Sequence, residues 1–125
     1  MQDTLKVFKA LSDQTRLRIV NLLLERECCV CEVMQAMKIS QTRASRGLRA
    51  LYDTGILKVR RDGLWALYSV DEESIGKSYN CLVQLIRSTL NYNEVADGDR
   101  ERLKSAVRES PCVARVSILD RSPLK

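Results

Sequence analysis

Three of the five cysteines in this chain lie within four consecutive residues. They occur in the sequence Glu27-Cys28-Cys29-Val30-Cys31-Glu32, and the chain contains no histidine. A group of three thiolates suits arsenite and antimonite, with Cd(II) or Pb(II) as further options, whereas zinc usually takes four ligands, often including histidine. We therefore predict a metal site at Cys28, Cys29 and Cys31 that binds a thiophilic ion, with no organic cofactor. The alternative is that these cysteines are small buried core residues.

The spacing of these thiols indicates a switch. In a regular helix Cys28 and Cys31 share a face, and Cys29 lies about 100° away. Three sulfurs converge on one ion only if the first helical turn is irregular or opens. A helix N-terminus and Arg26 should lower the pKa of these thiols, while the two flanking glutamates should raise it.

The two remaining cysteines lie far from this cluster. Cys81 falls within an apolar helical band, which predicts a core residue. Cys112 follows Pro111 in the C-terminal tail, and we interpret it as a surface thiol, with a role as a further ligand as the alternative. A disulfide from Cys29 or Cys31 to either of these residues would instead make the protein a thiol redox sensor.

Residues 39–70 predict a polar helix followed by a basic β-hairpin. Ala44, Leu48 and Leu51 recur at helical spacing and form an apolar face, while the opposite face carries hydroxyl groups and arginines. This is the chemistry of a helix that enters a major groove. Asp62-Gly63 predicts the hairpin tip, with φ > 0 at both positions. The residues predicted to contact DNA are Ser40, Gln41, Thr42, Arg43, Ser45, Arg46, Arg49, Arg60 and Arg61.

Most of the other predicted elements along the chain are helices. Two helices precede the cysteines, the second with Ser12 or Asp13 as its N-cap. A third begins near Cys29 to Cys31 and ends near Lys38. A long helix follows the hairpin, residues 97–99 break the pattern, and residues 100–109 form one more helix. The fold class is therefore mainly α with a small β-hairpin, a winged helix-turn-helix.

The long helix carries an apolar band wider than a small domain needs, which predicts a homodimer. The residues assigned to dimerisation are Leu5, Phe8, Ile75, Tyr79, Leu82 and Ile86. We expect a DNA-binding and dimerisation domain over residues 1–95 and a partly flexible C-terminal extension over residues 96–125.

Charge and composition favour a polyanionic partner. The chain has 125 residues, a formal net charge of +5 and a pI near 9.1, which supports binding to double-stranded DNA. Charged residues interrupt the apolar positions of residues 1–24, so neither a signal peptide nor a transmembrane run is expected. We expect a cytoplasmic protein with no membrane partner. In that reducing compartment, five cysteines, an odd number, are not expected to form a structural disulfide framework.

Over Thr4 to Leu90 the chain resembles the ArsR/SmtB family of dimeric winged-helix repressors. Residues 11–19 are similar to the family's opening motif, residues 39–46 to its recognition helix, and residues 60–63 to its wing. Cys29-Val30-Cys31 followed by an acidic residue resembles the metal-binding box of the arsenical-responsive branch. The resemblance implies a repressor that binds operator DNA without ligand and is released when its thiols are ligated.

Carried over to this chain, the first two ligands would be Cys29 and Cys31. The branch's third cysteine corresponds to Met34 here, which makes Cys28 the nearest substitute. The family often has histidine where Gly47 stands, and glycine in a helix should cost about 1 kcal/mol relative to alanine.

An enzymatic function is the weakest alternative. Cys28 and Cys31 have the Cys-x-x-Cys spacing of a small thiol oxidoreductase, but that activity requires a βαβ setting, and no strand is predicted before them. We therefore predict no catalytic residues and no enzyme activity.

Overall fold

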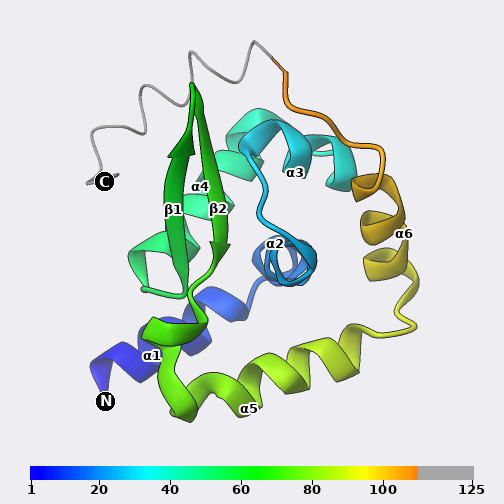
Figure 1. Ribbon diagram of the computed structural model, residues 1–125. Helices are drawn as coiled ribbons and strands as arrows, with labels where there is room; N and C mark the ends of the chain where they lie inside the picture. Colours follow the sequence, from blue (N-terminus) through cyan, green and yellow to red (C-terminus); the bar gives the residue numbers. More distant parts are fainter. Residues whose placement is uncertain (110–125) are drawn as a thin grey trace.

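The computed structural model describes residues 1–109, except for the side chains of residues 74–79. Six helices and a two-stranded sheet make up this part of the chain, and the helices surround α2 (Figure 1). In chain order the elements are α1 (Gln2–Leu11), α2 (Gln14–Glu25), α3 (Val30–Met37), α4 (Gln41–Asp53), β1 (Leu57–Asp62), β2 (Trp65–Val70), α5 (Glu72–Leu90) and α6 (Glu94–Leu103).

Local sequence signals define the ends of α2 and α4. Asp13 is the N-cap of α2, and its carboxylate accepts a hydrogen bond from the Arg16 amide at 3.0 Å. Ser40 caps α4 in the same way through the amide of Arg43. Such caps satisfy amides that have no partner within a helix. Gly55 follows α4 with φ +86°, a conformation that favours glycine.

The hairpin is antiparallel, but its tip differs from the prediction. Asp62 pairs with Trp65, so the two loop residues are Gly63 and Leu64. Gly63 has φ +62°, while Asp62 stays in the extended strand. The prediction of positive φ at both Asp62 and Gly63 was therefore wrong. Glycine at the first loop position is typical of a type II′ turn, which matches the twist of the flanking strands.

The last helix also begins earlier than expected. α6 starts after Asn93, whose side chain caps the Ala96 amide at 3.0 Å, and it continues through residues 97–99, where a break was predicted. Figure 1 shows α6 beside α3, and Asp99 is completely buried there. The expected boundary after residue 95 thus falls inside a helix that packs on the rest of the fold.

The core is built around α2, where Ile19 and Leu22 are fully buried together with Leu48 of α4 and Leu67 of β2. Gly47 accounts for the close packing of α4 on α2, because a Cβ at this position would lie 2.5 Å from Cδ1 of Ile19. Glycine at position 47 is expected to cost helix stability, but it allows a close helix contact. Alanine at this position would require Ile19 to move.

The α1–α5 face keeps apolar side chains in solvent. Leu5 and Phe8 are half exposed, Ile86 is buried and Leu82 is partly buried. The side chains of the other two residues assigned to dimerisation, Ile75 and Tyr79, lie outside the described residues. Within the part of the chain that the structure describes, no helix has the length and apolarity needed to cross a bilayer.

Candidate nucleic-acid interface and cysteine segment

Helices α3 and α4 form a helix-turn-helix. Between them Lys38 adopts the left-handed conformation, with φ 55° and ψ 48°, and directs the chain into the Ser40 cap. Ala44, Leu48 and Leu51 of α4 are fully buried, as predicted. The opposite face of α4 is therefore presented to solvent.

Most residues predicted to contact DNA are accessible. Ser40, Thr42, Arg43, Arg46, Arg49, Arg60 and Arg61 are exposed, whereas Gln41 and Ser45 are partly buried. All of them come from α4, its cap or strand β1. Helix and hairpin thus offer hydrogen-bonding groups and arginines, the combination needed to read bases and hold phosphates.

Two arginines of α4 have partners within the protein. Arg43 Nη2 donates to Thr15 Oγ1 at 2.7 Å, and Arg49 Nε pairs with Asp53 Oδ1 at 3.0 Å. The first contact ties the start of α4 to the start of α2. The second is an exposed pair one helical turn apart, which contributes little stability and can be exchanged for phosphate.

The wing, β1 and β2 with their loop, also forms arginine–carboxylate pairs with other parts of the chain. Arg60 makes two contacts with the carboxylate of Glu27, one of them from Nε to Oε2 at 2.9 Å. Asp62 accepts from Arg108 Nη1 at 2.8 Å. Arg60 is therefore already neutralised by Glu27, which directly precedes the cysteines.

Cys28 belongs to the sheet and not to a helix. Its amide donates to Tyr68 O at 3.0 Å, and its carbonyl accepts from Tyr68 N at 2.8 Å, which makes it a one-residue third strand beside β2. Its thiol is fully buried and donates to Arg26 O at 3.4 Å. The helical spacing assumed for Cys28 and Cys31 therefore does not apply.

Cys29 and Cys31 lie at the start of α3. Cys29 is the N-cap, and its amide donates to Glu32 Oε1 at 3.0 Å. Cys31 is in the first turn, 5% exposed, with Sγ 3.6 Å from Glu109 O. Cys31 is disulfide-bonded, while Cys28, Cys29 and Cys81 are free thiols. Cys81 is exposed on α5, contrary to the predicted core position, and Cys112 lies outside the described residues.

Burial controls the protonation of the free thiols in this segment. It raises the pKa of Cys28 to about 12, and Arg26 only partly opposes this effect. Burial also raises the pKa of Cys29. The sequence-based expectation weighed neighbouring charges and the helix N-terminus but could not include burial, which decides the direction.

The described residues contain no group of three or more Cys, Asp or Glu side chains arranged to hold a metal ion. Because Cys28 and Cys29 have no exposed surface, an ion can reach them only if the segment opens. Thiol groups are the chemical kind of ligand that a soft ion takes, and in this conformation the two free thiols of the segment are shielded from solvent.

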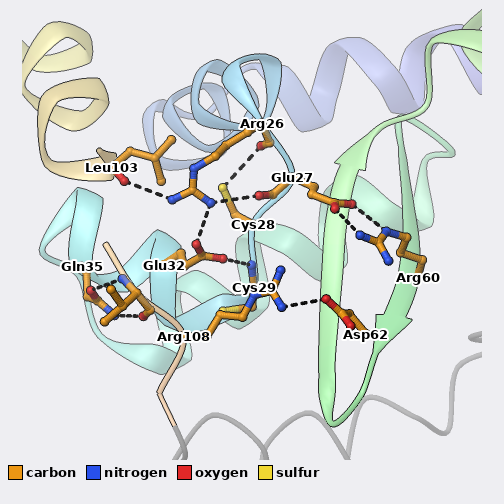
Figure 2. A network of polar contacts seen from close by, with 11 residues as sticks. Arg26, Glu27, Cys28, Cys29, Glu32, Gln35, Arg60, Asp62, Leu103 and Arg108 are labelled. Carbon is orange, nitrogen blue, oxygen red and sulfur yellow. Dashed lines mark hydrogen bonds and ion pairs between the residues drawn. The ribbon is translucent and has the colours of Figure 1, made fainter. Parts of the chain in front are cut away.

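A polar network surrounds the cysteines (Figure 2). Arg26 Nη1 pairs with Glu32 Oε2 at 2.6 Å, and its Nη2 donates to Leu103 O at 3.0 Å. The side chain of Gln35 makes two hydrogen bonds with the backbone of Val107. Its Nε2 donates to Val107 O at 2.6 Å, and its Oε1 accepts from Val107 N at 3.0 Å. Sequence reasoning did not find these contacts because their partners are 6 to 77 residues apart and no local pattern marks them.

Similarity to known proteins agrees with this arrangement. Residues 13–59 match the family described as bacterial regulatory protein, arsR family. The chain is 47% identical over 74 residues to a cadmium resistance transcriptional regulatory protein CadC homolog of Staphylococcus aureus, covering 58% of this chain and 61% of that protein. It is 46% identical over 68 residues to the arsenic resistance transcriptional regulator ArsR1 of Pseudomonas putida, covering 54% and 53%. The chain thus spans less than two thirds of either relative.

One solved structure is similar in fold and carries a description of its assembly. It is the homodimeric winged helix-turn-helix DNA-binding domain of a possible ArsR-family transcriptional regulator from Mycobacterium bovis, with a TM-score of 0.61 and 28% identity. The similarity covers 74% of this chain and 82% of that chain.

The helix-turn-helix, the exposed basic face of α4 and the hairpin define a winged-helix DNA-binding regulator. The matched family and the relatives are described as transcriptional regulators and not as enzymes, which argues against the thiol oxidoreductase alternative. This chain belongs to the ArsR family.

Proposed function

We propose that this chain is a transcriptional repressor released from double-stranded operator DNA when arsenite or antimonite binds the thiols of residues 28–31. The observation that carries the proposal is the position of Cys29 and Cys31. They form the N-cap and first turn of α3, the helix that packs directly on the recognition helix α4. A ligand that rearranges this turn acts one helix away from the DNA. Cd(II) and Pb(II) are the alternative ligands.

Burial of the thiols supports a two-state mechanism. In the closed form Cys28 and Cys29 are inaccessible and protonated at neutral pH, because burial raises the pKa of both thiols. Binding of an ion to thiolates must therefore open the segment and release protons. Ligand affinity is then coupled to a conformational change, which an allosteric repressor needs.

The test is operator binding by the reduced protein, measured by fluorescence anisotropy on DNA from its own upstream region. Cys29→Ser and Cys31→Ser should bind this DNA normally and fail to respond to arsenite, whereas Cys81→Ser on exposed α5 should respond like the wild type. Typical couplings of about 1 to 3 kcal/mol correspond to a several-fold to hundredfold release. Release of the Cys29/Cys31 double variant by arsenite would refute the proposed site.

The DNA contacts are part of this proposal. Thr42, Ser45 and Arg46 would read bases, while Arg60 and Arg61 would hold phosphates. Arg46→Ala should relax sequence preference, with an expected loss of about 1 to 3 kcal/mol at the operator, and Arg61→Ala should weaken binding to all DNA and reduce the salt slope. Unchanged operator affinity in both variants would contradict the assignment.

A homodimer would present two copies of α4 to a near-palindromic operator. The half-exposed Leu5 and Phe8 on α1 support an interface on the α1–α5 face. Phe8→Glu should shift the protein to monomer in sedimentation and lower operator affinity at least tenfold. Wild-type protein that sediments as a stable monomer at micromolar concentration would contradict the homodimer.

One observation favours thiol oxidation as a second candidate signal. Cys31 is disulfide-bonded, and this bond must be reduced before Cys31 can bind arsenite. If oxidation is the signal, peroxide should release wild-type protein from DNA and leave Cys31→Ser bound, with no arsenite present.

A further inference from the structure

The cysteine segment, residues 26–31, is joined to the wing by its backbone. Cys28 and Tyr68 exchange both amide hydrogen bonds, at 3.0 and 2.8 Å, so this segment extends the edge of the hairpin. Tyr68 is in the middle of β2 and pairs with Val59 of β1 on its other side. A displacement of Cys28 therefore acts directly on the ladder of the wing.

A charged pair makes a second connection. Glu27 directly precedes Cys28, and its carboxylate binds the guanidinium of Arg60 at two points (Figure 2). Arg60 is the β1 residue proposed to hold a phosphate. Opening of the cysteine segment would remove this carboxylate and change both the position and the local charge of the wing.

The third connection comes from the segment after α6. We call residues 105–109 the C-terminal strap. Gln35 fixes the strap to α3 through both backbone groups of Val107. The next residue, Arg108, reaches the wing, where it pairs with Asp62 at 2.8 Å and lies 5.7 Å from the centre of the Trp65 ring. The strap thus passes from the helix that carries Cys31 to the tip of the hairpin.

Helix α4 is held differently. Its inner residues Leu48 and Leu51 are fully buried, and Gly47 packs against Ile19 without room for a Cβ. In the wing, Ala66 and Leu67 of β2 are buried in the core, but the two charged pairs on the side of the cysteines are partly exposed. These two pairs can exchange partners at low cost, and unlike the exposed pair within α4 they connect the wing to other segments of the chain.

We infer that the wing is an output of the cysteine switch, with Glu27 and Arg108 as the positioning residues that couple the cysteine segment to Arg60 and the hairpin tip. This inference rests on the proposed function and adds the regulatory connection to it. Ligation of the cysteines would displace Glu27 and the strap together, and the wing would lose its orientation toward the DNA backbone.

The test compares release ratios, defined as operator affinity without arsenite divided by affinity with saturating arsenite. The full-length proteins are wild type, Glu27→Gln, Arg108→Gln and the double variant, reduced with a phosphine because dithiols bind arsenite. Each variant should keep the ultraviolet absorption of arsenic–thiolate bonds, while its release ratio falls at least threefold, with the largest loss in the double variant. Glu101→Gln is the matched control, since Glu101 on α6 forms an exposed pair at 2.9 Å with Lys104, the C-cap of that helix, outside the strap.

Charge reversal provides a second measurement. The pair Asp62→Arg with Arg108→Asp restores the attraction with opposite polarity, so it should recover the wild-type release ratio that Arg108→Asp alone loses. Hydrogen exchange should also detect arsenite-induced loss of protection at the β1 and β2 amides of the wild type.

The outcomes separate the two proposals. If wild-type protein fails to bind arsenite, the proposed function and this inference both fail. If all variants bind arsenite and show the wild-type release ratio, or if wing amides keep their protection on ligation, the inference alone is overturned and the switch acts without the wing.

Discussion

Arginine–carboxylate pairs stabilise two regions of this protein, the α6 side and the wing, but the carboxylates of the two regions differ in burial. Asp99 on α6 has no exposed side-chain surface and is bound by Arg18 at 2.8 Å and by Arg102 at 3.0 Å. In the two pairs that involve the wing, the side chains of Glu27 and Asp62 are 33% and 50% exposed beside Arg60 and Arg108. The chemistry is the same, but one carboxylate is removed from water and the others are not.

The two arginines around Asp99 also bind the end of α3. Arg18 donates to Met37 O at 3.3 Å, and Arg102 donates to Ala36 O at 2.7 Å. These carbonyls belong to the last turn of the helix, where cations are favourable. The α6 side therefore fixes the C-terminal end of α3, while the cysteines and the exchangeable pairs lie at its N-terminal end.

This difference suggests that burial decides which ion pairs are structural and which can exchange. Breaking a buried pair leaves a charge without compensation, whereas water replaces an exposed partner readily. Of the pairs compared, those of Asp99 face the core, and those of Glu27 and Asp62 lie at the wing, which we propose contacts DNA. We expect three measurements to separate the regions.

The largest effect should follow Asp99→Ala. Loss of the buried carboxylate should lower the free energy of unfolding by about 3 kcal/mol, near the lower limit for buried pairs because Arg18 and Arg102 remain partly exposed. Urea unfolding of Asp99→Ala and of the exposed control Glu101→Gln measures this difference. Equal losses of unfolding free energy in the two variants would show that burial of the carboxylate does not determine how much these pairs stabilise the fold.

Salt should have an intermediate effect, confined to the wing. Raising ionic strength from about 0.1 to 1 M shortens the Debye length from about 10 to 3 Å and screens exposed charges preferentially. Wing amides, including Tyr68 N–H, should lose several-fold protection in hydrogen exchange, while α6 amides keep theirs. An equal loss of hydrogen-exchange protection in the wing and in α6 would contradict this prediction.

Acid should produce the smallest effect. The hydrogen bond from Arg60 lowers the pKa of Glu27 below its ordinary 4.5, and that from Arg108 lowers the pKa of Asp62 below 3.8. Stabilisation from depressed carboxyl pKa values is fully present above the ordinary value and is lost as pH falls through the lowered one. The stabilisation from the wing pairs should therefore be fully present down to pH 4.5 for Glu27 and 3.8 for Asp62, and each pair should separate as pH falls further, through the lowered pKa of its carboxyl.

Trp65 reports this acid transition, because Arg108 lies over its ring and the chain has one tryptophan. Its fluorescence should change as pH falls below the ordinary carboxyl values in the wild type. In Arg108→Gln the Asp62 component of this change should be absent. An identical titration in both proteins would exclude the Arg108–Asp62 pair as its source.

Sequence patterns were sufficient for elements that depend on neighbours along the chain. The N-cap at Asp13, one of the two positions predicted, and the apolar face of α4 both follow from residues within a few positions of one another. The hairpin was also predicted, although its loop is displaced by one residue. The resemblance in the motifs was enough for the winged-helix class, and the similarities to known proteins confirm the family.

Tertiary structure decided the features that join distant parts of the chain. Cys28 became a strand residue because Tyr68 lies beside it, and burial, which depends on the whole fold, set the direction of its pKa shift. The pairs Glu27–Arg60, Asp62–Arg108 and Arg18–Asp99 span 33, 46 and 81 residues. Local periodicity carries no information about such partners, because their meeting depends on how the helices pack and not on the order of residues within any one of them.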